Sequence, residues 1–568
     1  MKTLLVAVNA KYIHTNIAVR LIKGYAEKHG ISGIEIAEFT INEQIGDILR
    51  GIVSRRPELL GFSCYIWNIG MIRQLCVLVK TILPHLRIVL GGPEVSYRPE
   101  EILRDFSCDY VISGAGEEAF SRLISCPENA ETIGGVSGRN ADGSVFSNKN
   151  ISPVDMALLP FPYDDLGETE HKICYYEASR GCPFGCSYCL SSADRNVQFA
   201  PIDKVKSELK RFIDARVKQV KFVDRSFNCR ADFSEEIIRF IIENDNGITN
   251  FHFEIEAMLI TEGFISLMNC ARRGLFQLEI GVQSVNPETL AAVHRKSDFS
   301  LLSEQVGKLL RPQNVHIHLD LIAGLPLEDF QSFRQSFDMV ASLQPHQLQL
   351  GFLKVLRGSG LEGDARRYGI KYSPFPPYEV LSTDCLSYED ICRLKQVEAA
   401  CELFVNSGRY CHSVNLLMKS NNSLFDLLLS VSEYSEKCGK PLSAHNKLSP
   451  YELLISYAKE RTDIPHKHMK AAAKLDFLLH ERPKNSPDIF DGNMLSRDEI
   501  YNAIVRENLC GLLENPEGLS AKELFGYVHL EKFPVDPFTY EENPTVVLFD
   551  YRHMDMRGNS EFILIGDR

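Results

Sequence analysis

The chain has 568 residues, of which 44% are hydrophobic and 24% charged, a composition typical of globular proteins that excludes a collagenous, fibrous or wholly disordered chain. At about 100–200 residues per domain, this length predicts about three domains. Lys and Arg number 62 against 75 Asp and Glu, so the net charge of −13 argues against a protein that grips nucleic acid through bulk positive charge.

The first region, residues 1–135, alternates apolar strands with helical patterns. Strands are predicted at 4–8, 34–39, 59–63, 87–90 and 110–112, and helices at 17–29 and 71–83. This alternation favours an open parallel sheet of the Rossmann-like type, with its ligand crevice outside the carboxyl ends of the strands. Polar residues interrupt the first apolar run and no small-residue cleavage site follows. We therefore interpret that run as a strand instead of a signal peptide and expect a cytoplasmic protein.

Two further regions follow. Residues 136–168, rich in Gly, Ser, Asn, Asp and Pro, are predicted to be a linker. A second βα series spans 169–365, with strands expected at 174–178, 220–223, 251–255, 277–280, 316–322 and 347–352. Six such strands predict a partial (β/α)6 barrel. Residues 366–568 are predicted to be mainly helical, with a β-pair at 545–551 and 562–565, and we find no catalytic motif there.

A group of three cysteines carries the strongest chemical signal. Cys182, Cys186 and Cys189 form a C-x3-C-x2-C motif after the first strand of the second series, at a strand end where barrel chemistry usually lies. Thiolates are ligands of iron–sulfur clusters, and three of them on a four-iron cube leave one iron open. The alternatives are a zinc site or a chance cluster, but zinc normally needs a fourth Cys or His at short spacing. The other cysteines are scattered, as expected of reduced thiols.

This loop resembles the signature of the radical S-adenosylmethionine (SAM) superfamily, including Tyr188 before the last cysteine. Residues 222–228, 278–284 and 320–328 are similar to the later strand motifs of the subgroup that often carries an N-terminal cobalamin-binding domain. The resemblance implies a [4Fe-4S] cluster that reductively cleaves SAM to a 5′-deoxyadenosyl radical. By motif position it assigns four residues to the SAM pocket, each of which could instead tie loops together: Asp224, Glu254, Gln283 and Ser284. Glu256, two residues along the same strand, points the same way as Glu254 and competes with it.

The first region has glycine loops at 89–96 and 114–118 that resemble those of cobalamin-binding folds, where backbone must approach a bulky ligand. In such folds the nucleotide tail lies between the sheet and a helix, which implies contacts with Gly61, Ser63, Gly91, Gly92, Gly114 and Gly116. Lys11 stands where the family often has a cobalt-binding His, and a protonated Lys cannot ligate cobalt. We therefore predict cobalamin without a His ligand from the protein. His14 as a shifted ligand and a domain that has lost its cofactor are the alternatives.

The resemblance implies a cobalamin-dependent radical SAM enzyme, and methylation of an unactivated carbon is the reaction that we expect. One alternative is a radical SAM oxidoreductase or mutase with a vestigial or non-methylating B12 domain. Another is a non-catalytic iron–sulfur binding module. We expect a small-molecule or peptide substrate and an electron donor such as flavodoxin or ferredoxin. The net negative charge argues against a nucleic acid partner. No membrane partner is expected, since every apolar run is shorter than the roughly 18–20 residues that span a bilayer. The C-terminal region resembles an uncharacterised extension of such proteins.

Overall fold

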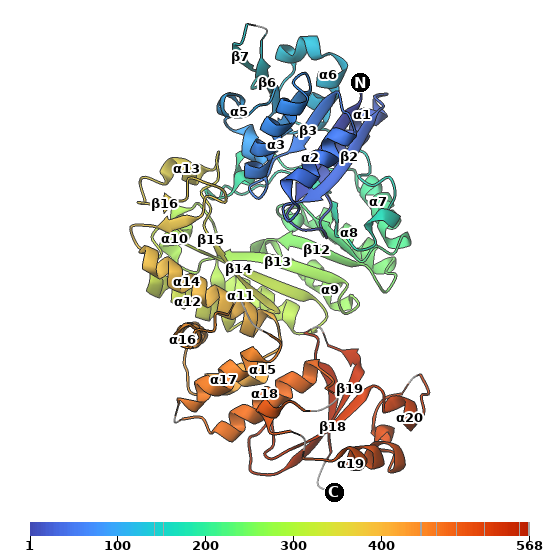
Figure 1. Ribbon diagram of the computed structural model, residues 1–568, viewed down its shortest axis with the longest axis vertical. Coiled ribbons are helices and arrows are strands. Elements are labelled where there is room, and N and C mark those ends of the chain that lie inside the picture. Colours follow the sequence, from blue (N-terminus) through green and yellow to red (C-terminus); the bar gives the residue numbers. More distant parts are fainter. Residues whose placement is uncertain are drawn as a thin grey trace.

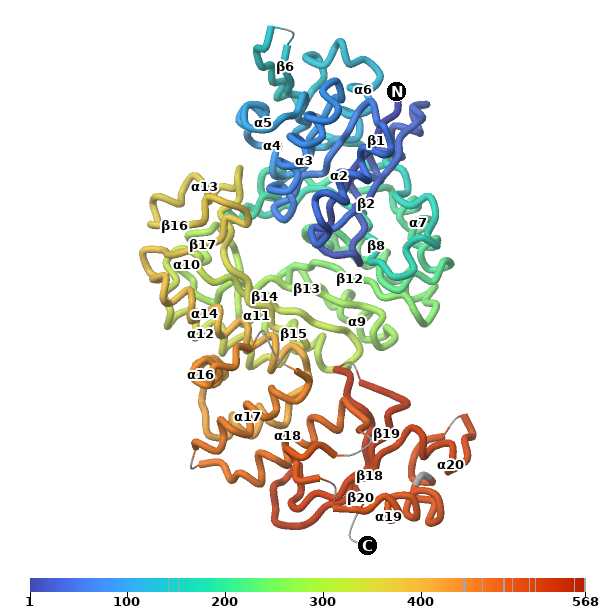
Figure 2. The backbone as a smooth tube through the Cα atoms, viewed as in Figure 1, coloured from blue at the N-terminus to red at the C-terminus, as the bar shows by residue number. Residues whose placement is uncertain are grey.

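In the computed structural model, three regions follow one another along the long axis of the molecule, from the N-terminal region at one end to the C-terminal region at the other (Figures 1 and 2). The structure describes residues 1–140, 142–151, 153–442, 446–461, 463–483, 486–492, 494–515, 517–555 and 557–565. Within these ranges, no helix combines the length and the apolar character needed to cross a bilayer. The predicted fold class is confirmed: a Rossmann-like domain, a partial barrel and a mainly helical C-terminal region.

The N-terminal domain is built on a seven-stranded sheet in the order β2-β1-β3-β4-β5-β6-β7. Its strands are β1 Thr3–Asn9, β2 Ile34–Thr40, β3 Leu59–Ser63, β4 Arg87–Gly91, β5 Tyr110–Ile112, β6 Val136–Arg139 and β7 Val145–Ser147. Its helices are α1 Ile17–Lys28, α2 Ile45–Ser54, α3 Ile69–Ile82, α4 Pro93–Ser96, α5 Pro99–Asp105 and α6 Glu117–Ser125. The first five strands are parallel. β1 and β3 are buried along their whole length, which is why both read as unbroken apolar runs.

The segment predicted as a linker begins with two strands. β6 and β7 extend the first sheet in antiparallel fashion. Further along this segment, Tyr163 is buried and connects both domains. Its hydroxyl donates to the carbonyl oxygen of Tyr175 at 2.9 Å and lies 3.0 Å from the hydroxyl of Thr15.

The second region is a six-stranded parallel sheet in the order β15-β14-β13-β12-β11-β8. These strands match the six that the sequence predicts: β8 Cys174–Tyr176, β11 Gln219–Phe222, β12 Asn250–Ile255, β13 Phe276–Gln283, β14 His316–Ala323 and β15 Gln347–Phe352. Its helices are α7 Ile202–Asp214, α8 Ala231–Glu243, α9 Glu262–Cys270, α10 Pro287–Ala292, α11 Phe299–Leu310, α12 Phe330–Ala341 and α13 Gly360–Asp364. A short antiparallel pair, β9 Ser179–Arg180 and β10 Gln198–Phe199, brackets the cysteine loop.

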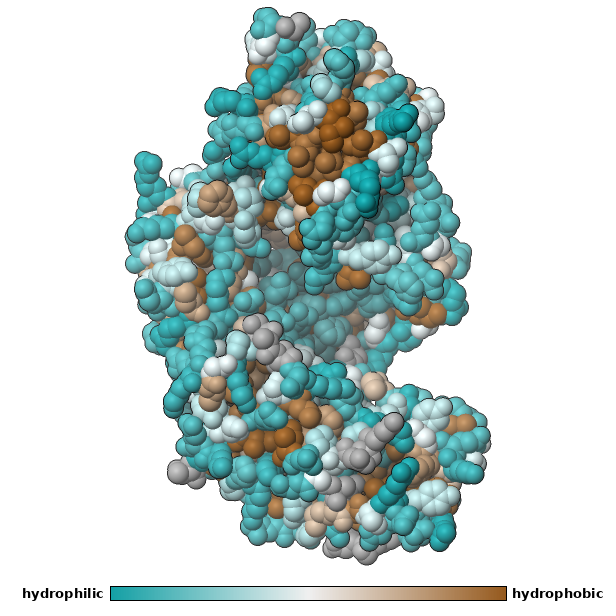
Figure 3. Space-filling view, in the orientation of Figure 1, coloured by the Kyte–Doolittle hydropathy of each residue, from teal (hydrophilic) through white to brown (hydrophobic). Residues whose placement is uncertain are grey.

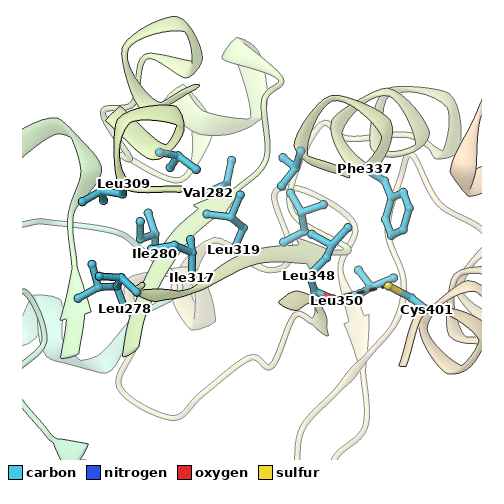
Figure 4. Packing of buried hydrophobic residues seen from close by; sticks show 14 of the residues in the cluster. Leu278, Ile280, Val282, Leu309, Ile317, Leu319, Phe337, Leu348, Leu350 and Cys401 are labelled. Atoms are coloured by element: carbon cyan, nitrogen blue, oxygen red, sulfur yellow. Dashed lines mark hydrogen bonds between the residues drawn. The ribbon is translucent and has the colours of Figure 1, made fainter. Parts of the chain in front are cut away.

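The two faces of the barrel sheet differ in character. On the outer face, apolar side chains such as Leu278, Ile280 and Leu319 pack beneath α11 and α12 (Figure 4). Buried and half-buried residues alternate along β13, because successive side chains of a strand point to opposite faces. The polar side chains that alternate with these apolar ones point to the inner face. The space-filling view shows a hydrophilic hollow between this sheet and the N-terminal domain (Figure 3).

The C-terminal region is mainly helical, as predicted. Its helices are α14 Tyr388–Cys401, α15 Cys411–Met418, α16 Leu424–Lys437, α17 Ser449–Lys459, α18 His466–His480, α19 Arg497–Tyr501 and α20 Ala521–Leu524. The predicted β-pair is confirmed as β19 Thr545–Met554 and β20 Ser560–Ile565. A third strand, β18 Val528–Phe533, pairs with β19 and was not predicted.

A short hairpin at the start of the C-terminal region reaches back to the N-terminal domain. It consists of β16 Lys371–Tyr372 and β17 Val380–Ser382. In the turn between the two strands, the buried hydroxyl of Tyr378 donates to Glu94 Oε2 at 2.8 Å. Nearby, Arg98 of the N-terminal domain forms an ion pair with Glu362 at 2.6 Å. The first and last regions therefore touch across the barrel mouth.

Candidate functional site

The three cysteines singled out by the sequence line one cavity of about 220 Å³ at the carboxyl ends of the barrel strands. Cys182 and Cys186 are buried, and Cys189 is partly exposed. The loop is held by its own backbone: the Cys182 N–H donates to the carbonyl of Asp194 at 3.0 Å, and the Cys189 N–H to that of Cys186 at 3.1 Å. Gly181 starts the loop at φ +104°, where a side chain would lie 2.8 Å from a neighbouring carbonyl oxygen. Glycine is thus required at that position.

The donor set fits an iron–sulfur cluster with one open iron. Among the described residues that line this cavity there is no fourth cysteine and no histidine. In the part of the chain that the structure describes, no three Cys, His, Asp or Glu side chains gather closely enough to hold a single metal ion. A four-iron cube needs no such gathering, because each thiolate binds a different iron. Burial raises the pKa of Cys182, and a bound metal ion would favour its thiolate form.

Arg295 lies beside the cysteines, although the sequence assigns no role to it. Its side chain is 10% exposed, and Nη2 donates to Glu256 Oε2 at 2.9 Å and to the carbonyl oxygen of Gly281. Nη1 lies 3.9 Å from Cys186 Sγ. A permanently charged guanidinium in this place offsets the negative charge of ligand thiolates. The sequence signal for it is its position a short way beyond the β13 motif.

Two of the four residues predicted for the SAM pocket, Glu254 and Gln283, line the cysteine cavity, and so does the competing residue Glu256. Gln283 has φ +71° at a register shift in β13, and its Oε1 is buried without a hydrogen-bond partner. Glu256 Oε1 is also buried without a partner. Leaving such an acceptor unsatisfied costs about 1–3 kcal/mol. These atoms therefore favour a bound ligand that donates hydrogen bonds.

Asp224 and Ser284 are not among the described residues that line the cavity. Asp224 is fully buried; its Oδ2 accepts the Ala178 N–H at 3.0 Å and its Oδ1 the Ser179 hydroxyl at 2.6 Å. Burial raises the pKa of Asp224 to about 7. The Ser284 hydroxyl donates to Glu328 Oε1 at 2.6 Å. Both residues tie the ends of strands to loops, and their contact with SAM stays a prediction.

A second cavity, of about 350 Å³, lies at the carboxyl edge of the N-terminal sheet, against α1 and α6. All six residues predicted to contact cobalamin line it: Gly61, Ser63, Gly91, Gly92, Gly114 and Gly116. Leu5, Val89 and Phe120 contribute apolar walls. A Cβ added to Gly61 would lie 2.7 Å from Leu5 Cδ2, so a larger residue would fill the space. The cavity therefore fits a bulky, partly apolar group such as the nucleotide tail of cobalamin.

His14, the alternative cobalt ligand, is not among the described residues that line this second cavity. Its Nδ1 lies 2.8 Å from the hydroxyl of Tyr175 in β8. Burial lowers the pKa of His14, which favours the neutral ring in this contact. The residue serves the interface between the first two regions.

The two cavities adjoin one another at the junction of the domains. Val223 lines the second cavity, and Arg225, two residues further along, lines the first. Arg180, immediately before the cysteine loop, lines the glycine-rich cavity together with Glu117 and Glu177. Its guanidinium donates to both oxygens of Glu117, at 2.9 and 3.3 Å, and to both oxygens of Glu177, at 2.6 and 2.9 Å. Glu117 begins α6, so this cluster joins the cysteine loop to the N-terminal domain.

Three family models match successive parts of the chain. Residues 3–124 match the B12 binding domain, and residues 176–340 match the radical SAM superfamily. Residues 366–549 match a family described as a protein of unknown function, DUF4080. The three matches follow the three regions of the fold.

Among curated proteins, the chain is similar to the cobalamin-dependent radical SAM methyltransferase TokK of Streptomyces tokunonensis, with 24% identity over 355 residues, 58% of this chain and 52% of TokK. The chain thus spans about half the length of the curated relatives that it matches. Among solved structures, the methyltransferase TsrM from Kitasatospora setae has a TM-score of 0.55 at 16% identity, covering 66% of this chain and 78% of TsrM.

The structure of OxsB, a cobalamin-dependent SAM radical enzyme, has a TM-score of 0.57 at 14% identity and covers 85% of this chain and 73% of OxsB. At these identities the structural likeness shows the fold alone. Together with the family matches, it agrees with the two adjoining cavities and the C-x3-C-x2-C loop. The chain is therefore a radical SAM protein with an N-terminal B12-binding domain and a C-terminal domain of the DUF4080 family.

Proposed function

We propose that this protein is a cobalamin-dependent radical SAM methyltransferase that acts on an unactivated carbon. The observation that carries the proposal is the adjacency of the three-cysteine cavity and the glycine-lined cavity at Val223 and Arg225. The curated relative TokK, which is a methyltransferase by name, supports the reaction type. When bound, the cluster supplies the electron that cleaves SAM to methionine and a 5′-deoxyadenosyl radical, and cobalamin carries the methyl group.

The residues of the chain bind and orient these groups. Cys182, Cys186 and Cys189 would hold three irons of the cluster, and the other residues that line the cavity would surround SAM. Glu256 and Gln283 each offer a buried oxygen without a partner to the hydrogen-bond donors of SAM. Acceptors that are already fixed in place cost little reorganisation when the ligand arrives.

The junction of the domains sets the geometry between the two cofactors. Arg180 holds the strand before the cysteine loop against Glu117 at the start of α6. Because Glu117 also lines the glycine-rich cavity, its ion pair with Arg180 connects the cysteine loop to that cavity. The substrate would enter between them, and a one-electron donor such as flavodoxin or ferredoxin would reduce the cluster.

Anaerobic reconstitution with iron, sulfide and hydroxocobalamin tests the proposal. The reconstituted protein is incubated with SAM, dithionite and an extract of the cells that encode it, and the SAM products are measured by mass spectrometry. We expect 5′-deoxyadenosine and S-adenosylhomocysteine to form together. Formation of 5′-deoxyadenosine alone would refute methylation in favour of an oxidoreductase or mutase. Uncleaved SAM would favour an iron–sulfur binding module.

The ligand assignment has a matched control. Cys182→Ala removes one ligand and should abolish both the cluster absorbance and the cleavage of SAM. Cys229→Ala changes a partly buried thiol that is not among the described residues lining the cavity, and it should leave both intact. Cleavage of SAM by Cys182→Ala at the rate of the unchanged protein would refute the assignment.

A further inference from the structure

A third cavity, of about 580 Å³, lies between the barrel and the C-terminal region. On the barrel side, His316 and His346 line it at the amino ends of β14 and β15, whereas the cysteine cavity lies at the carboxyl ends of the sheet. The two cavities have no described lining residue in common. Pockets that bind small molecules measure roughly 300–1,000 Å³, so the third cavity has the size of a ligand site.

The C-terminal wall of the third cavity contains an unusual turn. α14 continues into a π-helical turn, Glu402–Asn406, and Gly408 follows it with φ +70°. The Asn406 side chain holds this turn against the edge of the barrel sheet: its Nδ2 donates to the carbonyl oxygen of Leu348 and its Oδ1 accepts the Leu348 N–H, each at 2.9 Å. Turns of this kind are rare and frequently lie at functional sites.

One face of α15 is turned to the third cavity. Cys411, Val414, Asn415 and Met418 all line it, and their spacing places them on one side of the helix. Val414 and Met418 are half-buried, and Leu424 at the start of α16 continues this apolar lining. An apolar part of a ligand would leave water on contact with these side chains, which favours binding.

His346 can donate a hydrogen bond to a ligand in the third cavity. Its Nδ1 accepts the Ile317 N–H at 3.2 Å. Burial and the charge of Arg557 lower the pKa of His346 to about 4, so the ring is neutral. A neutral imidazole that accepts through Nδ1 carries its proton on Nε2. Among the described residues, this Nε2 has no hydrogen-bond partner.

Arg557 supplies positive charge to the third cavity. Its exposed side chain lines the cavity, and Nη1 lies 3.8 Å from Cys411 Sγ. Its guanidinium forms no ion pair with a carboxylate in the described ranges. Asp555 accepts the backbone N–H of Arg557 at 2.8 Å, and Asp338, which lines the cavity, accepts the Phe425 N–H at 3.0 Å. The guanidinium is therefore available to an anionic group.

We propose that the third cavity binds an amphiphilic small molecule whose carboxylate meets Arg557 and His346 and whose apolar body packs against Val414 and Met418. Charge-assisted hydrogen bonds from arginine to a carboxylate are among the stronger ones in proteins. Such a ligand touches both the barrel and the C-terminal region, so the DUF4080 domain contributes a binding site of its own. The proposal goes beyond the proposed function and does not depend on it.

Alkylation of Cys411 tests the site, because this thiol is partly exposed and lines the cavity. The reconstituted holoenzyme reacts anaerobically with iodoacetamide, and mass spectrometry follows the Cys411 peptide. The probes are octanoate, octylamine, octanol and inorganic phosphate. Octanoate at about ten times its dissociation constant should slow the reaction of Cys411 about tenfold. Exposed Cys438, which is not among the described residues lining the cavity, should react at an unchanged rate.

The other probes decide the ligand class. Equal slowing by octylamine or octanol overturns the anionic group, and equal slowing by phosphate overturns the apolar body. If no probe slows the reaction of Cys411, the site itself is overturned.

Matched substitutions connect the protection to the cavity. Arg557→Gln removes the charge and should raise the octanoate concentration for half-maximal protection about tenfold. Asn415→Glu places a like charge on an exposed position of the same α15 face and should also raise it. Arg50→Gln changes an arginine of α2 that is 79% exposed and should leave it unchanged. Equal concentrations for Arg557→Gln, Asn415→Glu and the unchanged protein overturn the proposal.

Discussion

Arg180→Ala tests whether the junction of the first two domains is held by charge. The guanidinium is 26% exposed, whereas the side chains of Glu117 and Glu177 are 5% and 14% exposed. Removing one partner of a buried ion pair costs about 3–5 kcal/mol, and partial exposure of the arginine reduces our expectation to about 2–3 kcal/mol. At about 2–4 °C per kcal/mol for domains of this size, the melting temperature should fall by about 5–10 °C.

A double-mutant cycle with Glu117→Ala isolates the pairwise contribution, with thermal unfolding of the protein followed by fluorescence. Residues that share hydrogen bonds should show a coupling free energy of about 1.5–3 kcal/mol. Arg122→Ala is the control, because Arg122 is an exposed arginine of α6 whose ion pair with Glu118 spans 3.6 Å. Its effect on stability should stay below about 0.5 kcal/mol. Additivity of Arg180→Ala and Glu117→Ala within about 0.5 kcal/mol would refute the reasoning.

Two further predictions concern the glycine-lined cavity and the C-terminal region. Gly61→Leu should fill the space beside Leu5 and abolish hydroxocobalamin binding, measured by visible absorbance after gel filtration, while the iron content stays unchanged; Gly46→Leu, where nothing lies within 4 Å of the added Cβ, should bind normally. Full binding by Gly61→Leu would show that the nucleotide tail lies elsewhere. Burial raises the pKa of Asp476 from 3.8 to about 7. Asp476 stays protonated to a higher pH in the folded state than in the unfolded state. The stability that this protonated carboxyl group contributes is therefore complete below about pH 4 and is lost as the pH rises through 7. Between about pH 5.5 and 8, the melting temperature of Asp476→Asn should therefore fall less than that of the unchanged protein. An equal fall in both proteins would contradict the raised pKa of Asp476.

The parts of the fold that the sequence predicts are those with a continuous local signal. The six barrel strands are apolar on the face that packs beneath the helices, and the three cysteines lie within eight residues of one another. β6, β7 and β18 are harder to recognise. β7 is exposed or half-buried along its length, and β18 carries Glu531 and Lys532 in its centre, so neither shows an apolar run.

The candidate site was predictable only where a motif carried it. Arg295 reaches Cys186 from a position 109 residues further along the chain, and no local pattern encodes such a contact. Asp320 and Glu254 come from different strands, and their proximity follows from the register of the sheet. Motif position places Asp224 in the SAM pocket; in the structure its oxygens accept hydrogen bonds from Ala178 and Ser179, and its contact with SAM stays a prediction.

The contact between Tyr378 and Glu94 has a consequence for how the polypeptide can be divided. Burial raises the pKa of Glu94, and the phenol of Tyr378 is the donor that satisfies its carboxylate. A fragment that stopped at the end of the barrel would remove this hydrogen-bond donor from the buried carboxyl group of Glu94. The C-terminal region thus completes the hydrogen bonding of a buried carboxyl group in the first domain, and the two regions are structurally connected although they lie far apart in the sequence.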